Sequence, residues 1–137
     1  MGKTVVFDFD GVIHSYTSGW KGETVISDPP VVGIENVLKE LDRKGYEIVI
    51  VSTRCSSYNG MKAVSEYLNR HGLNKYIKGL SADKPPAICY VDDRALKFDP
   101  AELDSLVEQI ENFKPWNDTG NKPKPASYGV WRTIRKG

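Results

Sequence analysis

The chain has 137 residues, a formal net charge of +1 and 27% charged residues. This length indicates one domain with a real core, and the near-neutral balance is not typical of a disordered chain or of a protein that coats nucleic acid. Cys55 and Cys89 lie far apart and do not suggest a disulfide framework, which favours a reducing, cytoplasmic location. No signal peptide precedes Asp8, and no apolar run approaches the roughly 20 residues of a spanning helix, so we expect no membrane association.

The most informative stretch covers residues 5–12, where three apolar residues precede two acids and a glycine. The apolar run lacks alternation, which is typical of a strand buried on both faces. Asp8 and Asp10 are two residues apart, so on an extended chain their side chains point the same way, and Gly11 permits a sharp turn after them. The pattern predicts paired acids at the carboxyl end of a central strand, where open α/β sheets bind ligands. The alternative is an ordinary Asp-Gly turn.

Further elements follow in chain order. Residues 12–17 and 23–27 are β-prone runs around a glycine-bearing turn, which predicts a small hairpin. Asp28 and the two prolines after it predict the start of a helix, and Gly45 predicts its end. Residues 46–51 are expected to form a second buried strand, and residues 57–70 a second helix.

The remaining elements repeat this alternation. Residues 76–80 and 87–91 are predicted strands, and Asp99 with Glu102 has the spacing of a helix-capping box. Leu103, Leu106 and Val107 are expected to give that third helix its apolar face, together with Ile110. Alternating strands and helices predict an α/β fold with a parallel sheet and right-handed crossovers over residues 1–114. Residues 115–137 form a Pro-rich basic extension, in which residues 127–134 are either an edge strand or a loose tail.

Polar groups that suit a divalent cation and a phosphate follow three of the predicted strands. They are Asp8 and Asp10, Ser52 and Thr53, and Asp92 and Asp93, with Lys84 shortly before the last strand. Because the carboxyl ends of parallel strands lie at one edge of a sheet, we expect these groups to converge.

This constellation resembles the four motifs of phosphatases of the haloacid dehalogenase superfamily, over roughly residues 4–113. The matching positions are Asp8-Phe9-Asp10-Gly11-Val12, Ser52, Lys84 and Asp92-Asp93. The resemblance implies a three-layer, Rossmann-like sheet flanked by helices. The gaps between the motifs hold only the hairpin, one helix and two short strands, so the chain is similar to capless members with an open site.

The resemblance also implies roles for the acids. Asp8 is expected to attack phosphorus and form an aspartyl-phosphate, while Asp10 donates a proton to the leaving oxygen and later takes one from water. Mg²⁺ is the expected cofactor, held by the Asp8 and Asp92 carboxylates and the Asp10 backbone carbonyl. Asp93 is expected to orient a metal-bound water or Lys84.

Other residues are expected to face the substrate. Ser52 and the Thr53 backbone N–H would bind phosphoryl oxygens, and Lys84 would balance negative charge in the transition state. A simple helix cap is the alternative for Ser52 and Thr53. Arg54 and Arg94 are either substrate contacts or surface ion-pair partners.

Four residues have no assigned chemistry. His14 is interpreted as a hairpin residue rather than a catalyst, and Cys55 and Cys89 as incidental, with Cys89 in the core. Trp20 is either a lid residue or an exposed turn residue.

The expected function is hydrolysis of a phosphomonoester, either a small molecule or a nucleic-acid end. Ser52-x-Arg54 and Asp92-Asp93-Arg94 are similar to the 3′-phosphatase domains of polynucleotide kinase-phosphatases, although the chain has no P-loop for a kinase half. A non-catalytic relative that binds a phospholigand or protein is the alternative from another class. A phosphotransferase or mutase is less expected without a cap that excludes water, and a dehalogenase least of all.

Overall fold

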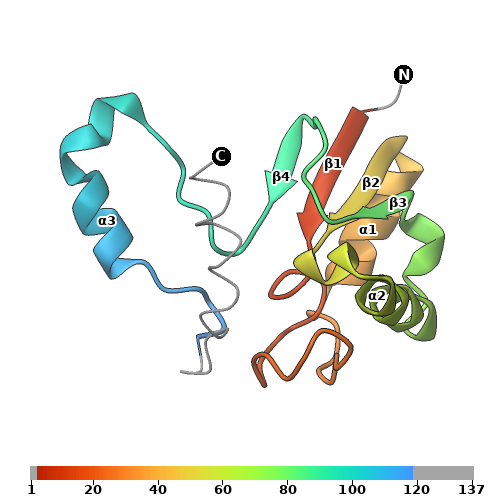
Figure 1. Cartoon of the computed structure of the whole chain (residues 1–137). Helices are drawn as coiled ribbons and strands as arrows, with labels where there is room; N and C mark the ends of the chain where they lie inside the picture. Colours follow the sequence, from red (N-terminus) through yellow and green to blue (C-terminus); the bar gives the residue numbers. More distant parts are fainter. Residues whose placement is uncertain (1–2, 119–137) are drawn as a thin grey trace.

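The computed structural model describes residues 3–118. These residues form a four-stranded parallel sheet in the order β3-β2-β1-β4 (Figure 1). The strands are β1 Lys3–Asp8, β2 Tyr46–Val51, β3 Gly79–Ser81 and β4 Cys89–Val91. The α-helices are α1 Ile34–Arg43, α2 Tyr58–Arg70 and α3 Leu106–Asn112, and short 3₁₀ helices cover Thr53–Ser56, Asn74–Tyr76 and Pro100–Ser105. The predicted α/β class with a parallel sheet is confirmed.

Strand β1 lies in the middle of the sheet and brings the acidic motifs to one edge. Phe7 pairs with Ile50 of β2 on one side and with Val91 of β4 on the other. Asp8 is the last residue of β1, and Asp92 directly follows β4. The carboxyl ends of all these strands meet at the edge where the chain from β1 to α1 lies (Figure 1).

Helices α1 and α2 cover the same face of the sheet. Val5 pairs with Ile48 and Phe7 with Ile50, so these four side chains lie on one face. The buried core joins them to Ile34 and Leu38 of α1 and to Val64, Tyr67 and Leu68 of α2. Successive right-handed crossovers from β1 to β2 and from β2 to β3 place both helices there.

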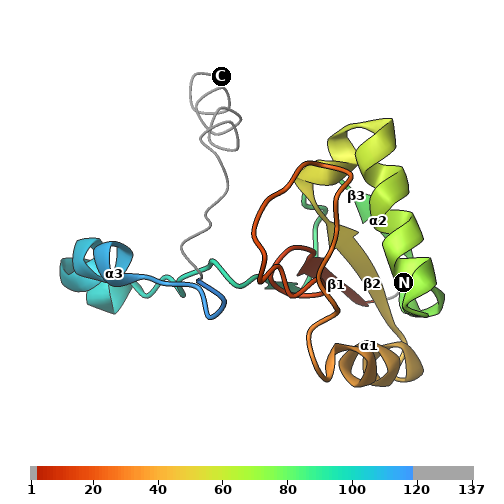
Figure 2. The same ribbon diagram turned by 90° about the horizontal axis from the view of Figure 1, so that it is seen from below.

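The third helix differs from the prediction. Leu103, Val107 and Ile110 are 54%, 68% and 58% exposed, and no residue of α3 is buried. Figures 1 and 2 show α3 standing apart from the sheet, so it does not supply the third layer that was expected. The predicted apolar stripe is divided between the 3₁₀ helix Pro100–Ser105, which holds Leu103, and α3, and the two helix types have different periods, so the stripe is not continuous. Cys89, predicted in the core, is exposed on the edge strand β4.

The predicted hairpin is wrong. Residues 9–33, which we call the site loop, contain only isolated bridges of His14 with Asp10 and with Pro30. Polar groups of this loop bond to side chains rather than across a ladder: the Asp28 carboxylate, for example, accepts from both the N–H and the hydroxyl of Ser18. Asp28 therefore does not begin α1, which starts only at Ile34, directly after a left-handed glycine.

The chain returns to the site loop after α3. The Trp116 indole Nε1 donates to the Gly11 carbonyl at 2.9 Å, and Asn117 Nδ2 donates to the Ser15 carbonyl at 2.8 Å. Packing therefore continues beyond residue 114, where the sequence suggested a boundary. The proposed edge strand over residues 127–134 lies outside the described residues. Within residues 3–118, the helices are too short or too polar to cross a membrane.

Candidate active site

Three of the predicted acids form a compact cluster at the carboxyl edge of the sheet. Carboxylate oxygens of Asp8, Asp92 and Asp93, one from each, lie within 4.8 Å of one another. Asp8 comes from β1 and the other two from the end of β4, its neighbour in the sheet. We call these three residues the acid triad.

Among the described residues no ion pair reaches Asp8 or Asp93, and the one that reaches Asp92 comes from the largely exposed Lys84. Burial first, and then the negative charge of Asp92, raise the pKa of Asp8 to about 8, although a hydrogen bond from the Phe9 N–H acts in the opposite direction. Burial also raises the pKa of Asp93, although the Arg94 charge works against this. Neither oxygen of Asp93 receives a hydrogen bond from another described residue, although both are buried. A buried carboxylate without donors is costly, so this cluster needs a proton or a cation.

A divalent cation fits this arrangement. Three carboxylates are a hard, oxygen-only donor set of the kind that Mg²⁺ prefers. Gly11 closes over the cluster: its φ is +89°, and a Cβ at that position would lie 2.2 Å from Asp93 Oδ2. Only glycine allows the site loop to pass so close to this carboxylate. The residues available to hold the cation are Asp8, Asp92 and Asp93.

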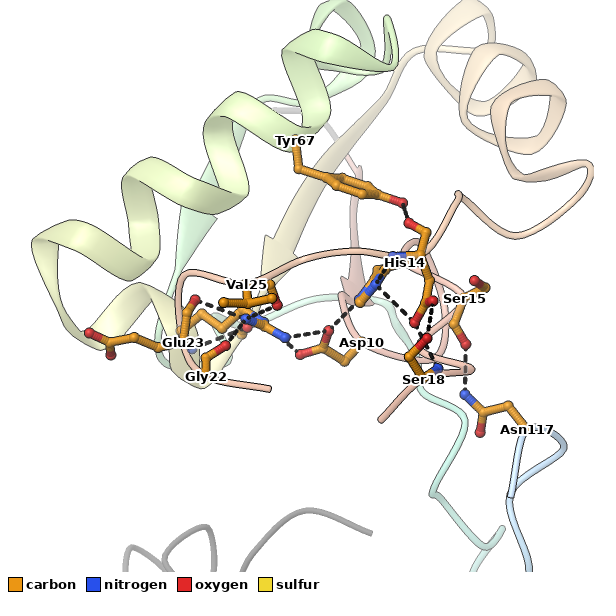
Figure 3. A network of polar contacts seen from close by, with 12 residues as sticks. Asp10, His14, Ser15, Ser18, Gly22, Glu23, Val25, Tyr67 and Asn117 are labelled. Atoms are coloured by element: carbon orange, nitrogen blue, oxygen red, sulfur yellow. Dashed lines mark hydrogen bonds and ion pairs between the residues drawn. The ribbon is translucent and has the colours of Figure 1, made fainter. Parts of the chain in front are cut away.

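Asp10 has entirely different surroundings. Its Oδ2 accepts from Arg54 Nε at 2.9 Å, and its Oδ1 accepts from Arg54 Nη2 at 3.2 Å and from His14 Nδ1, which is 2.8 Å away (Figure 3). Because Arg54 and His14 already bond to both carboxylate oxygens, the Asp10 side chain is not favoured as a metal ligand. The expected metal contact of Asp10 used its backbone carbonyl, which these contacts do not involve.

Arg54 is a buried partner of Asp10 and does not face solvent. Its side chain has no exposed surface, and its Nη1 donates to the carbonyls of Gly22 and Glu23 at 2.8 Å each. Trp20 lies over the guanidinium, 4.5 Å from its Cζ to the ring centroid. The prediction that Arg54 contacts substrate does not fit this burial. Trp20 packs on Arg54 and is half-buried, so it is not a fully exposed turn residue, and its role as a lid stays a prediction.

His14 was not predicted as a site residue, but it lies at the centre of the site loop. It is 1% exposed, and its Nε2 accepts from the Asp28 backbone N–H at 3.1 Å. Tyr67 of α2 donates to the Asp28 carbonyl at 2.9 Å. The only sequence signal for this contact was that His14 lies four residues after Asp10. That spacing brings the two side chains together only because the chain turns at Gly11.

The remaining predicted residues lie around the triad. Ser52 Oγ accepts from the Arg54 N–H at 3.1 Å and caps the 3₁₀ helix Thr53–Ser56, so the capping geometry expected as an alternative is present. Thr53 is exposed at the start of that helix. Lys84 Nζ lies 3.7 Å from Asp92 Oδ2 with its side chain largely exposed. Arg94 is exposed, and its backbone N–H donates to Asp92 Oδ1 at 2.8 Å.

Comparisons of the chain with protein-family models, with curated proteins and with solved structures found no match. The resemblance to haloacid dehalogenase phosphatases therefore rests on the four motifs and stays a prediction. What the residues can do follows from their geometry: the triad can hold a cation, and Asp10 is an acid held separately beside it.

Proposed function

We propose that this protein is a Mg²⁺-dependent phosphomonoester hydrolase that acts through an aspartyl-phosphate on Asp8. The observation that carries the proposal is the contrast between two acids only two residues apart. Asp8 is buried among carboxylates that raise its pKa, whereas Asp10 accepts hydrogen bonds from Arg54 and His14 on its two oxygens. Two carboxyl groups with opposed surroundings are typical of sites that divide nucleophile and acid–base roles.

The cluster links the nucleophile to a cation. With a pKa near 8 in the absence of metal, Asp8 is mostly protonated at neutral pH and is then a poor nucleophile. A cation held by Asp8, Asp92 and Asp93 would supply neutralisation of the triad and of the phosphoryl oxygens. Such a cation would favour the carboxylate form of Asp8, which is the form that can attack phosphorus.

The two half-reactions then use the two acids in turn. An Asp8 oxygen bonds to phosphorus as the bond from phosphorus to the leaving oxygen breaks, and Asp10 gives that oxygen a proton. In the second half, Asp10 takes a proton from water as the water oxygen bonds to phosphorus and releases Asp8. Lys84 and the Ser52–Thr53 turn, from neighbouring parts of the same sheet edge, would bind the phosphoryl oxygens.

A nucleic-acid end is the narrower candidate substrate. The Trp116 indole N–H donates to the Gly11 carbonyl, and Trp116 is 60% exposed. A large exposed aromatic surface therefore lies beside the site loop. Exposed aromatic rings of this kind stack on bases of single strands. A purely binding function is less supported, because it does not need a separately held acid at Asp10.

Phosphate release from a panel of esters tests the proposal. The panel contains sugar phosphates, mononucleotides and a 3′-phosphorylated oligonucleotide, each with Mg²⁺ and with EDTA. We expect Mg²⁺-dependent release by the unmodified protein and by Asp104→Asn, which changes an exposed acid of the 3₁₀ helix Pro100–Ser105, and none by Asp8→Asn. Release that persists in EDTA or in Asp8→Asn would contradict the proposal, as would no release from any ester.

A further inference from the structure

We propose that His14 is a positioning residue that determines which oxygen of Asp10 carries the proton during phosphoryl transfer. The inference rests on the proposed function, since it concerns the acid–base role of Asp10. It adds a residue to which neither the motifs nor the proposed mechanism gives a role. Three features of the site loop support it.

The first feature is the tautomer of the imidazole. The Asp28 backbone N–H lies 3.1 Å from His14 Nε2 and can only donate, so Nε2 must present its lone pair. The neutral ring then carries its proton on Nδ1, which lies 2.8 Å from Asp10 Oδ1. The Asp28 carboxylate does not compete for Nε2: its Oδ2 is 3.6 Å away and accepts from the Ser18 N–H at 2.8 Å.

The second feature is that the ring cannot turn. His14 stacks on Phe9 with centroids 5.7 Å apart and meets the edge of Tyr67 at 5.4 Å. Tyr67 of α2 also donates a hydrogen bond to the Asp28 carbonyl. Helix α2 therefore helps to fix the Asp28 backbone, whose N–H donates to His14 Nε2. Figure 3 shows Tyr67 and His14 on one side of Asp10, with the loop residues Gly22, Glu23 and Val25 on the other.

The third feature is an asymmetry in the Asp10 carboxylate. Oδ1 accepts two hydrogen bonds, from His14 and from Arg54 Nη2, whereas Oδ2 accepts one, from Arg54 Nε. A carboxylate oxygen has about two lone-pair sites, so only Oδ2 has one left for a proton. Arg54 alone does not distinguish the oxygens, because its fork contacts both. His14 fills the second site on Oδ1 and so directs the proton to Oδ2.

Leaving-group dependence tests this role. Proton delivery matters most when the leaving alcohol is weakly acidic, so an alkyl phosphate needs it more than p-nitrophenyl phosphate. We expect His14→Ala to lower kcat on the order of 10²-fold for the alkyl ester and less than about tenfold for the nitrophenyl ester, with little change in KM. His14→Asn, whose amide nitrogen can take the place of Nδ1, should recover most of the alkyl activity. His71→Asn, a change at the other histidine, which is exposed, should match the unmodified protein.

Equal losses on the two esters in His14→Ala, or no recovery in His14→Asn, would overturn the inference and leave only a folding role. Nitrogen-15 NMR of the imidazole gives a readout that needs no turnover: we expect a protected proton on Nδ1. A proton on Nε2, in a protein that hydrolyses both esters, would overturn the role of His14 alone. No hydrolysis by the unmodified protein would overturn the proposed function, and the role of His14 with it.

Discussion

Asp8 and Asp10 are separated by one residue and meet opposite physical conditions. Asp8 belongs to a triad of carboxylates whose negative charges repel one another. Within that triad, Asp93 receives no hydrogen bond from another described residue. Asp10 accepts from a buried arginine and a buried histidine. The described residues therefore supply hydrogen bonds to both oxygens of Asp10 but to neither oxygen of Asp93, so the triad favours a bound proton or cation.

The turn at Gly11 produces this difference. After β1 the chain bends back on itself, so that the backbone N–H groups of residues 12, 13 and 14 all donate hydrogen bonds to the Phe9 carbonyl. This brings the His14 ring beside the Asp10 carboxylate. Asp8, still within the strand, stays beside Asp92 and Asp93. A single tight turn thus places successive acids of one motif in two separate polar networks.

Removing Arg54 should have the largest effect. Arg54→Ala leaves Asp10 without its ion pair and removes the Nη1 hydrogen bonds to the Gly22 and Glu23 carbonyls, and breaking a buried pair from one side typically costs about 3–5 kcal/mol. Since Asp10 keeps some contact with solvent, we expect about 3 kcal/mol in urea unfolding. Arg43→Ala, which breaks the exposed pair with Glu40, is the matched control and should change little. If the two variants unfold at the same urea concentration, Arg54 does not support the loop.

The pH dependence of stability should separate the triad from Asp10. A carboxyl whose pKa is higher in the folded chain binds its proton more tightly there, so its contribution to stability falls as pH rises. For Asp8 the window runs from its ordinary value of 3.8 to about 8. In EDTA, Asp8→Asn should therefore gain stability over the unmodified protein progressively from pH 4 to pH 8, because asparagine does not ionise.

Thermal unfolding of both proteins at pH 5 and pH 8 measures this gain. With Mg²⁺ present, the gain should shrink, because a cation offsets the repulsion that asparagine removes. A constant difference across the two pH values would show that Asp8 is not desolvated as described. Asp104→Asn should give no pH-dependent difference in either buffer.

Gly11→Ala should have a smaller and more specific effect. The positive φ alone costs about 1–3 kcal/mol for a side-chain-bearing residue, and the added Cβ must also displace Asp93. Gly45→Ala is a close control, because Gly45 has a φ of +91° with nothing within 4 Å of the added atom. Both variants should lose stability in EDTA, Gly11→Ala more because of the contact with Asp93, but only Gly11→Ala should lose the increase in melting temperature caused by Mg²⁺. Equal Mg²⁺ responses in the two variants would place the cation elsewhere.

The sequence predicted the residues of the site that lie at the ends of strands. Apolar runs before Asp8 and before Asp92 identified β1 and β4, and parallel pairing then required their carboxyl ends to meet. The surroundings of Asp10 were not predictable, because they depend on Arg54, which is 44 residues away, and on a loop held by side chains instead of a ladder. The prediction of the third helix was wrong for a local reason: the capping signal at Asp99 is real, but it opens a 3₁₀ helix that ends at Ser105, so the apolar stripe is divided between two helix types.

The Mg²⁺ concentration dependence of phosphate release, compared in Asp93→Asn and Asp10→Asn, tests the division between the two acid networks most directly. We predict that Asp93→Asn needs at least about tenfold more Mg²⁺ for half-maximal rate, as for loss of a group that supports a metal site. Asp10→Asn should keep the same Mg²⁺ requirement and lose at least about 10²-fold in the maximal rate. The reverse pattern, or the same shift in both variants, would contradict the separation of a cation-binding triad from a separately held acid.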